Sequence, residues 1–179
     1  MNQPERRLYL IRSLLKERKE YIEIPSGAEG QRLLLRGLMN IREPGQASAE
    51  FIKIQDEYLK NEIELKGITD AEKLTTVQPG LYLWQGDITT LKCDAIVNAA
   101  NSGMTGCYIP NHRCIDNAIH TFAGVELRLA CAELMKKQGY PEPTGQAKIT
   151  PAFNLPSRYV LHTVGPIVQG KLTEQNKIQ

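Results

Sequence analysis

Apolar residues in the first third of the chain recur three or four positions apart, within segments rich in charge. Three such stripes follow one another, separated by the breaks Pro25-Ser26-Gly27 and Pro44-Gly45. This spacing is typical of amphipathic helices that pack on a shared core. Because no cluster of titratable side chains lies among the stripes, we expect residues 1–75 to form a helical N-terminal extension. The stripes consist of Leu8, Ile11, Leu14 and Leu15, then Leu33, Leu34, Leu35, Leu38 and Met39, then Phe51, Ile52, Ile54, Tyr58, Leu59 and Ile63.

From Pro79-Gly80 onward the pattern changes to short apolar segments separated by turns. The segment Leu81-Tyr82-Leu83-Trp84 is the first of them, and Trp84 is expected in the core. Helical spacing returns over Ile119–Met135 and ends at Gly139-Tyr140-Pro141. Strands that alternate with a helix indicate a layered α/β domain, which we expect over residues 76–179. The further strand candidates are residues 95–97, 147–150 and 159–164.

Composition and charge limit the classes of function that fit. The 179 residues carry a formal net charge of +2, which gives no electrostatic argument for a nucleic acid or membrane partner. No segment approaches the roughly 20 apolar residues of a membrane span, and the N-terminus lacks a signal-peptide pattern. Four irregularly spaced cysteines favour thiol chemistry in a reducing cytoplasm over a disulfide framework.

A short stretch in the second half places two thiols and an imidazole within eight residues. Cys107, His112 and Cys114 supply three of the donors that zinc prefers. Structural zinc sites usually use four protein ligands, whereas catalytic sites keep one position for water or substrate. The sequence therefore predicts a zinc site with an open position. The alternative is that the cysteines pack as small apolar groups and His112 is an ordinary loop residue.

Polar side chains follow the apolar segments where an α/β sheet would bind a ligand. Asp87 comes after the first segment, and Asn98 and Asn101 come after the second. Each of them taken singly is also compatible with an ordinary turn. Asp116 lies two residues beyond Cys114, where a helix is expected to begin. It is therefore either a helix N-cap or a carboxylate held beside the metal.

The remaining histidines and cysteines are expected to be structural. His120 in the predicted helix and His162 in a predicted strand have no obvious chemical partners in the sequence. Cys93 and Cys131 lie far from the Cys/His/Cys cluster along the chain, and we expect them to pack as apolar groups.

Several motifs occur in the order seen in macrodomains. The chain resembles, more narrowly, the zinc-dependent macrodomains of bacteria, which hydrolyse ADP-ribose from modified proteins and carry a helical N-terminal extension. The Cys/His/Cys loop is the most specific motif, because ordinary macrodomains have a glycine-rich stretch there. The motifs are Gly86-Asp87-Ile88-Thr89, Asn98-Ala99-Ala100-Asn101, Cys107 with His112 and Cys114, Ile115-Asp116-Asn117-Ala118-Ile119-His120, and Thr144-Gly145-Gln146-Ala147.

The resemblance implies a fold and a role for each matching residue. The fold would be a macrodomain-like three-layer α/β/α sandwich with a mixed sheet. Asp87 would accept a hydrogen bond from the adenine amino group, with the backbone of Ile88 beside it, and Asn101 would contact the distal ribose. The zinc would lie next to that ribose. The backbone of Cys114 and Ile115 would face the pyrophosphate or distal ribose, and Asp116, with Asn101, would be catalytic.

Three functions remain open from the sequence. The first is a zinc-dependent, glycosidase-type hydrolase that removes ADP-ribose from mono-ADP-ribosylated proteins. The second is a module that binds ADP-ribose without cleaving it, and the third is an inactive truncated fragment. Family members continue past residue 179 with further strands, so the resemblance implies a sheet that is incomplete at its C-terminus. It also implies a link to a sirtuin-type ADP-ribosyltransferase and a lipoylated carrier protein.

Overall fold

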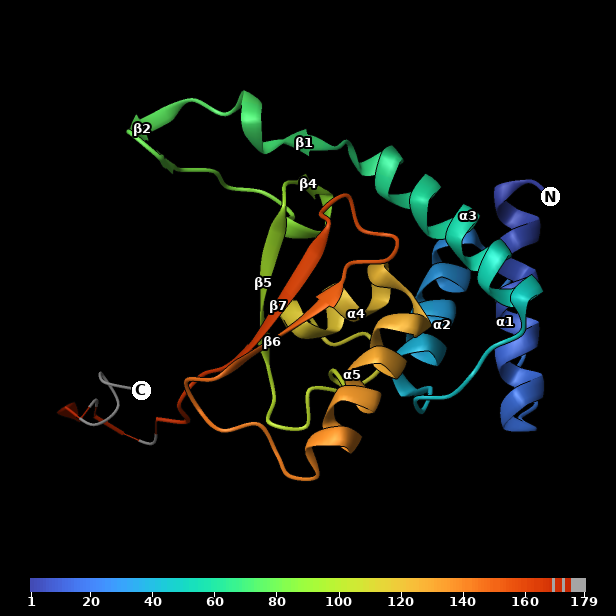
Figure 1. Ribbon diagram of the computed structural model, residues 1–179. Helices are drawn as coiled ribbons and strands as arrows, with labels where there is room; N and C mark the ends of the chain where they lie inside the picture. Colours follow the sequence, from blue (N-terminus) through green and yellow to red (C-terminus); the bar gives the residue numbers. More distant parts are fainter. Residues whose placement is uncertain (169, 172, 175–179) are drawn as a thin grey trace.

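The N-terminal third forms three helices, as the apolar stripes predict. The computed structural model describes residues 1–168, 170–171 and 173–174. Helices α1 (Gln3–Arg18), α2 (Ala28–Ile41) and α3 (Ala49–Lys66) pack together at one end of the molecule (Figure 1). Their shared core includes Leu10, Ile11, Leu14, Leu35, Leu38, Phe51, Tyr58 and Leu59.

These helices are continuous with the rest of the fold rather than appended to it. Val125, from a helix far along the chain, is buried in the core of the three N-terminal helices. In the opposite direction, Ile63 of α3 is buried in the second core, beneath the sheet. Buried apolar contacts of this kind are the main source of stability in a domain, so the helical region and the sheet stabilise each other.

A mixed three-stranded sheet forms the centre of the second half. Its strands are β5 (Ala95–Ala100), β6 (Ala147–Pro151) and β7 (Tyr159–Val164), in the order β5-β7-β6. Strand β7 is parallel to β5 and antiparallel to β6. The prediction of an α/β fold with a mixed sheet and a helical N-terminal region is confirmed.

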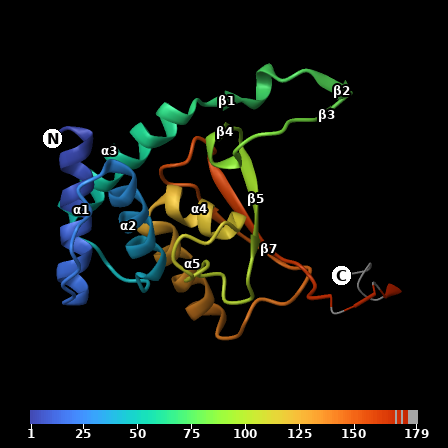
Figure 2. The ribbon, with the colours of Figure 1, turned by 180° about the vertical axis from the view of Figure 1, so that it is seen from behind.

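Alternating residues give this sheet one buried and one exposed face. Ile96 and Val160 point into the core, while Val97 and Ile149, 54% and 55% exposed, lie on the other face. Among the described residues, helices α4 (Ile115–Ala123) and α5 (Val125–Gln138) cover the buried face, with α1–α3 beyond them (Figures 1 and 2). Within the residues that the structure describes, no helix is long and apolar enough to span a bilayer.

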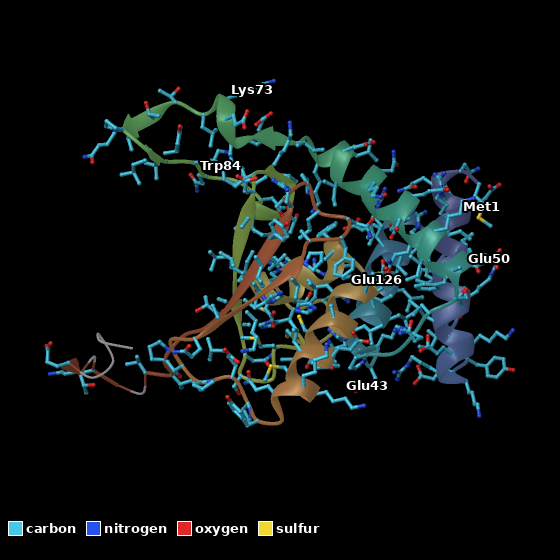
Figure 3. The ribbon with its side chains drawn as sticks, in the orientation of Figure 1. Met1, Glu43, Glu50, Lys73, Trp84 and Glu126 are labelled. Carbon is cyan, nitrogen blue, oxygen red and sulfur yellow. The ribbon has the colours of Figure 1, made fainter. Side chains whose placement is uncertain are left out.

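The segment between α3 and β5 carries four short strands. Strand β1 (Thr69–Asp70) pairs in parallel with β4 (Leu91–Lys92), and β2 (Thr76–Gln78) pairs with β3 (Leu81–Tyr82) in a protruding arm. Strand β3 is exposed, and Leu83 is 81% exposed. The expectation of a core position for Trp84 is wrong: this side chain is half-buried and lies on the segment that leaves the arm (Figure 3).

The prediction of one helix from Ile119 to Met135 is wrong, because the helix breaks at Gly124. This glycine has φ +100°, a conformation that other residues rarely adopt. Gln55 of α3 fills the break: its Oε1 accepts a hydrogen bond from Val125 N at 2.9 Å. Because of the break, α4 and α5 point in different directions: α4 packs against β5 and α2, and α5 packs against β6.

Replacing Gly124 with alanine is expected to lower the free energy of unfolding by about 2–3 kcal/mol, combining left-handed strain with loss of a buried hydrogen bond. A Cβ at this position would lie 2.6 Å from Gln55 Nε2. Gly139→Ala is the control for a positive φ without a close neighbour, because Gly139 has φ +80° and nothing within 4 Å of its Cβ position, although its ψ of 3° differs from the 174° of Gly124. Its cost should be only about 1 kcal/mol. Urea unfolding of both variants checks the difference, and equal losses would show that Gln55 is not the cause.

Candidate functional site

The loop between β5 and α4 brings the three predicted metal ligands together. One ligand atom each from Cys107, His112 and Cys114 lies within 4.8 Å of the other two. Cys107 Sγ is 3.6 Å from His112 Nδ1, which makes Nδ1 the ring nitrogen that faces the cluster. Two thiols and one imidazole at this spacing fit a zinc ion with one position left for another ligand.

The local backbone explains why these side chains converge. Gly106, immediately before Cys107, has φ +85°, and a Cβ there would lie 2.8 Å from the His120 ring. Asn111 has φ +55°, a left-handed conformation that asparagine tolerates better than most residues, and it turns the chain ahead of His112. Cys114 is the N-cap of α4, where its Sγ accepts a hydrogen bond from Asn117 N at 3.4 Å.

The environment of Cys114 disfavours its charged form unless a cation is present. Burial is the largest cause that raises the pKa of its thiol, and the neighbouring Cys107 and Asp116 add to it; the Asn117 hydrogen bond opposes the shift. A divalent ion beside the sulfurs would supply the missing positive charge and favour the thiolate. The donor set and the spacing therefore fit zinc, and binding of the ion would release the thiol proton of Cys114.

Asp116 lies in the first turn of α4 and points inward. The structure excludes its role as the N-cap, since Cys114 occupies that position. Its carboxyl group is 5% exposed and accepts a hydrogen bond from Asn98 Nδ2 at 2.8 Å. Burial raises its pKa, and the Asn98 bond partly offsets that rise. A buried carboxylate with a raised pKa is suited to proton transfer.

The sequence suggested that Asn98 would point toward a ligand at the end of its strand. In the structure it points into the interior instead. It is fully buried, and its Nδ2 donates both to Asp116 and, at 3.1 Å, to Nδ1 of His162. Because Nδ1 accepts, Nε2 of the neutral ring carries the proton and donates to Thr150 Oγ1 at 2.9 Å. Strand residues alternate between faces, and Asn98 falls on the inner one.

His162, His120 and Cys131, which the sequence suggested are structural, form a second close group in the buried interior. Burial lowers the pKa of His120 to about 3 and that of His162 to about 4, and raises that of Cys131 to about 12. Both nitrogens of His162 are already bonded. Although their ligand atoms lie within 4.8 Å of one another, a neutral thiol and an engaged imidazole make poor metal ligands.

Asp87 lies just before the short 3₁₀ helix Ile88–Thr90 and is already engaged. Its Oδ1 accepts hydrogen bonds from Thr89 N and Oγ1, at 3.0 and 2.6 Å. Lys66 Nζ, from the end of α3, pairs with Oδ2 at 2.9 Å. Burial tends to raise the pKa of Asp87, but the bonds from Thr89 and Lys66 outweigh it and lower that pKa. A nucleotide amino group would therefore share Oδ2 with Lys66.

Asn101 holds the start of the loop that carries Cys107, His112 and Cys114. Its Nδ2 donates to Gly106 O at 3.0 Å, and its Oδ1 accepts from Gly103 N at 2.9 Å. Contact with a ribose would require one of these bonds to be shared or released. Of the two residues whose backbones the resemblance places beside the nucleotide, Ile115 is 37% exposed and Ile88 is half-buried.

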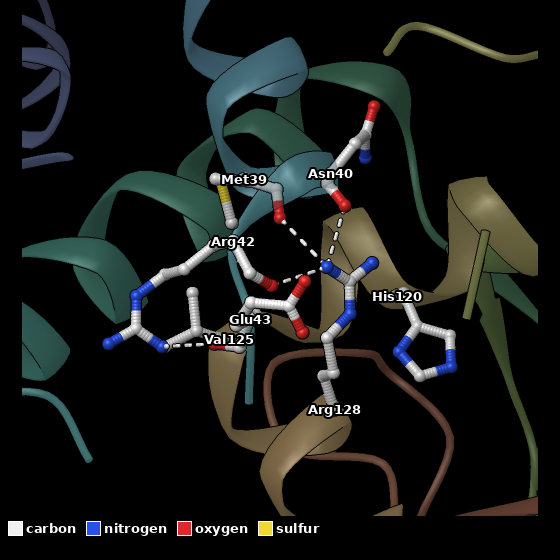
Figure 4. A pocket seen from close by; sticks show the side chains of 8 residues that line it. Met39, Asn40, Arg42, Glu43, His120, Val125 and Arg128 are labelled. Atoms are coloured by element: carbon white, nitrogen blue, oxygen red, sulfur yellow. Dashed lines mark hydrogen bonds between the residues drawn. The ribbon is translucent and has the colours of Figure 1, made fainter. Parts of the chain in front are cut away.

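The sequence alone did not reveal a buried cation next to the site. Arg128 of α5 lies in a small pocket with His120, and its guanidinium points at the C-terminus of α2 (Figure 4). Its Nη1 donates to Asn40 O and Arg42 O at 2.6 Å each, and its Cζ lies 4.2 Å from the centre of the Tyr108 ring. The sequence feature that could have identified Arg128 as a buried residue is its position between the apolar residues Leu127 and Leu129.

Comparison with known proteins identifies related chains. The family model for the Macro domain matches residues 97–179. A protein-ADP-ribose hydrolase of Treponema medium is 58% identical over 182 residues, covering 98% of this chain and 70% of that protein. A Staphylococcus aureus protein of the same name is 46% identical over 164 residues, covering 90% of this chain and 61% of that protein.

A solved structure agrees with the fold. The Trypanosoma brucei macrodomain in complex with ADP superposes with a TM-score of 0.50 at 30% sequence identity. The match covers 75% of this chain and 60% of the trypanosome chain. The alignments cover 75 to 98% of this chain, and the chain spans 60 to 70% of the length of these relatives.

Proposed function

This chain belongs to the macrodomain family, and on that premise we propose that it is a zinc-dependent hydrolase that releases ADP-ribose from mono-ADP-ribosylated proteins. The name of its relatives in Treponema and Staphylococcus supports the hydrolase part. The convergence of Cys107, His112 and Cys114 on one point supports the zinc part and is the single observation on which the proposal depends most.

The metal would be held by the two thiolates and by Nδ1 of His112. When bound, it would supply Lewis-acid polarisation of a ligand oxygen at its open position. The remaining chemistry falls to the protein. The first turn of α4 presents backbone N–H groups, which favour the pyrophosphate. Asp87 and the backbone of Ile88 would bind the adenine, and Asn101 the distal ribose.

Asp116 is the residue to which we assign proton transfer. It would orient the attacking water and take its proton while the water oxygen bonds to the anomeric carbon of the distal ribose. The bond from that carbon to the modified side chain breaks with its electron pair going to the side-chain atom, which would receive the proton from Asp116; the transition state has oxocarbenium character. Asn98, bonded to both Asp116 and His162, holds the carboxyl group in one orientation.

A binding module is the second candidate, and one observation favours it. Asp116 is only 5% exposed and faces the interior, which suits a role in stabilising the loop as well as one in catalysis. Such a module would use Asp87 and Asn101 but would not require the metal. The modified target and the sirtuin-type transferase stay predictions from the resemblance, and the cytoplasmic location stays a prediction from the four irregularly spaced cysteines.

Three measurements on the same preparation separate these functions. Elemental analysis gives the zinc content, and a release assay on a mono-ADP-ribosylated protein gives turnover. About one zinc per chain together with ADP-ribose release supports the hydrolase. Metal-free protein that binds ADP-ribose in calorimetry without releasing it identifies a binding module. Absence of ADP-ribose binding excludes both and leaves a fragment with no nucleotide function.

Replacing Asp87 with asparagine is expected to weaken ADP-ribose binding about tenfold, because a hydrogen bond to a charged acceptor contributes about 1.5 kcal/mol or more. Asp70→Asn is a matched control: Asp70 also accepts from a backbone N–H two residues on and pairs with a lysine, Lys92. That variant should bind ADP-ribose as the parent protein does. Calorimetry on both variants decides, and equal affinities would remove Asp87 from the binding site.

A further inference from the structure

Helix α2 contacts the loop of residues 107–114, which carries the three predicted zinc ligands, directly through Arg36. The guanidinium Nη2 donates to His112 O at 3.0 Å and to Asn117 Oδ1 at 2.9 Å. Nε of the same side chain lies 3.3 Å from that Oδ1. One half-buried arginine thus binds the backbone of a predicted zinc ligand and a side chain in the helix that follows the loop.

Asn117, in turn, is hydrogen-bonded to two further residues of the loop, Ile109 and Cys114. The side chain is fully buried, and its Nδ2 donates to Ile109 O at 3.0 Å. Its backbone N–H donates to Cys114 Sγ at 3.4 Å. Because Arg36 occupies Oδ1 of Asn117, the amide can present only Nδ2 to the loop. Arg36 therefore fixes the orientation of the residue that supports Cys114.

Asn40, one turn further along α2, holds the middle of the loop. Its Oδ1 accepts from Asn111 N at 2.9 Å, and its Nδ2 donates to Thr121 Oγ1 at 2.9 Å. Asn111 is the residue with φ +55°, and a left-handed conformation costs about 1–2 kcal/mol outside glycine. The bond to Asn40 offsets that cost at the position directly before His112.

The C-terminus of α2 is tied to the start of the loop by Arg128. This buried side chain donates to Asn40 O and Arg42 O and stacks on Tyr108, the neighbour of Cys107. Helix α2 therefore contacts the loop directly at Asn111 and His112, and it reaches the parts of the loop next to Cys107 and Cys114 through Arg128 and Asn117. An eight-residue loop free of such contacts would lose conformational entropy each time it closed on an ion.

We propose that helix α2 is the outer scaffold of the Cys107/His112/Cys114 loop, and that Arg36 is the positioning residue that keeps the loop in its metal-binding conformation. This inference rests on the proposed zinc site and adds a role for the N-terminal helices in it. Groups that hold metal ligands in place from outside commonly contribute 10- to 100-fold to metal affinity.

The test compares Arg36→Met with Arg32→Met in the full chain. Arg32 lies on the same helix, but it pairs with Glu62 of α3 at 3.0 Å and is 48% exposed at its side chain. The zinc dissociation constant, measured by competition with a chromophoric chelator, should rise about 10- to 100-fold in Arg36→Met. It should stay within about threefold of the parent in Arg32→Met. Thermal unfolding of the metal-free variants checks that both remain folded.

Amide hydrogen exchange in the metal-free proteins gives a second readout that needs no zinc. Exchange over residues 107–117 should be faster in Arg36→Met than in the parent and unchanged in Arg32→Met. Parent-like zinc affinity in Arg36→Met overturns the proposal. If the parent chain binds no zinc, the zinc site itself fails, and exchange alone decides whether α2 holds the loop: unchanged exchange in Arg36→Met then overturns the scaffold role as well.

Discussion

Replacing Asp116 with asparagine is expected to reduce ADP-ribose release about 1,000-fold while leaving ADP-ribose binding within a few-fold of the parent. The asparagine keeps the shape of the side chain, and its carbonyl oxygen can still accept the hydrogen bond that Asn98 Nδ2 donates at 2.8 Å. What it loses is the ability to take a proton from water. General base catalysis contributes about 100- to 10,000-fold in enzymes, and the expected loss lies within that range.

The control for this variant is Asp94→Asn, which removes a carboxylate that is 88% exposed at its side chain and pairs with Arg158 at the surface. Release should be unaffected there. Single-turnover release and calorimetry on both variants separate turnover from binding. Release by Asp116→Asn at the parent rate would refute the assignment of Asp116. A parallel loss of binding would instead show that Asp116 supports the ligand or the loop rather than the proton transfer.

The parts of this molecule that the sequence predicted are those encoded locally. The apolar stripes of α1, α2 and α3 each lie within one helix, so periodicity was enough to find them. The Cys/His/Cys group also lies within eight residues, and a stiff loop needs little more to bring the three side chains together. For Asn98 the failure was a matter of sheet geometry, since the inner face of β5 could not be identified without its partner strand.

What the sequence did not reveal depends on contacts between distant segments. Arg36 and Asn117 are 81 residues apart, and Lys66 and Asp87 are 21 apart. Within the N-terminal helices these two basic residues look like ordinary solvated charges. The break at Gly124 likewise depends on Gln55, a residue of α3. A helical segment expected to be an extension thus supplies side chains to both the predicted metal loop and the predicted adenine acceptor.

Acidification from about pH 7.5 to about pH 5 is expected to lower the free energy of unfolding by about 4 kcal/mol, mainly through two buried histidines. Burial lowers the pKa of His120 to about 3 and that of His162 to about 4, from an ordinary value of 6.5. In this range the unfolded chain therefore binds a proton at each ring and the folded chain does not. Their contribution is fully present above pH 6.5 and is lost as the pH falls toward 4 and 3.

The charged groups around these rings set the limits of the effect. Arg128 and His162 add to the lowered pKa of His120. Asp116 works in the opposite direction: because burial raises its pKa, its ionisation costs stability as the pH rises, and acid relieves that cost. The carboxyl groups whose pKa values are lowered in the fold, including Asp70, Asp87 and Glu142, take up protons mainly below about pH 4.5. Above about pH 5 the carboxyl groups with lowered pKa stay ionised, so the slope is set by the two histidines and opposed by Asp116.

Urea unfolding at several pH values, with chelator present so that metal release does not contribute, measures the slope. Two protons taken up on unfolding correspond to about 2.7 kcal/mol per pH unit well below pH 6.5. His120→Leu removes one of the two rings, so its slope should fall to about half while the Asn98–His162–Thr150 bonds remain. A slope that is the same in parent and variant would assign the proton uptake to other groups. His120 would then contribute nothing to the pH dependence, and His162 alone could not account for an uptake of two protons.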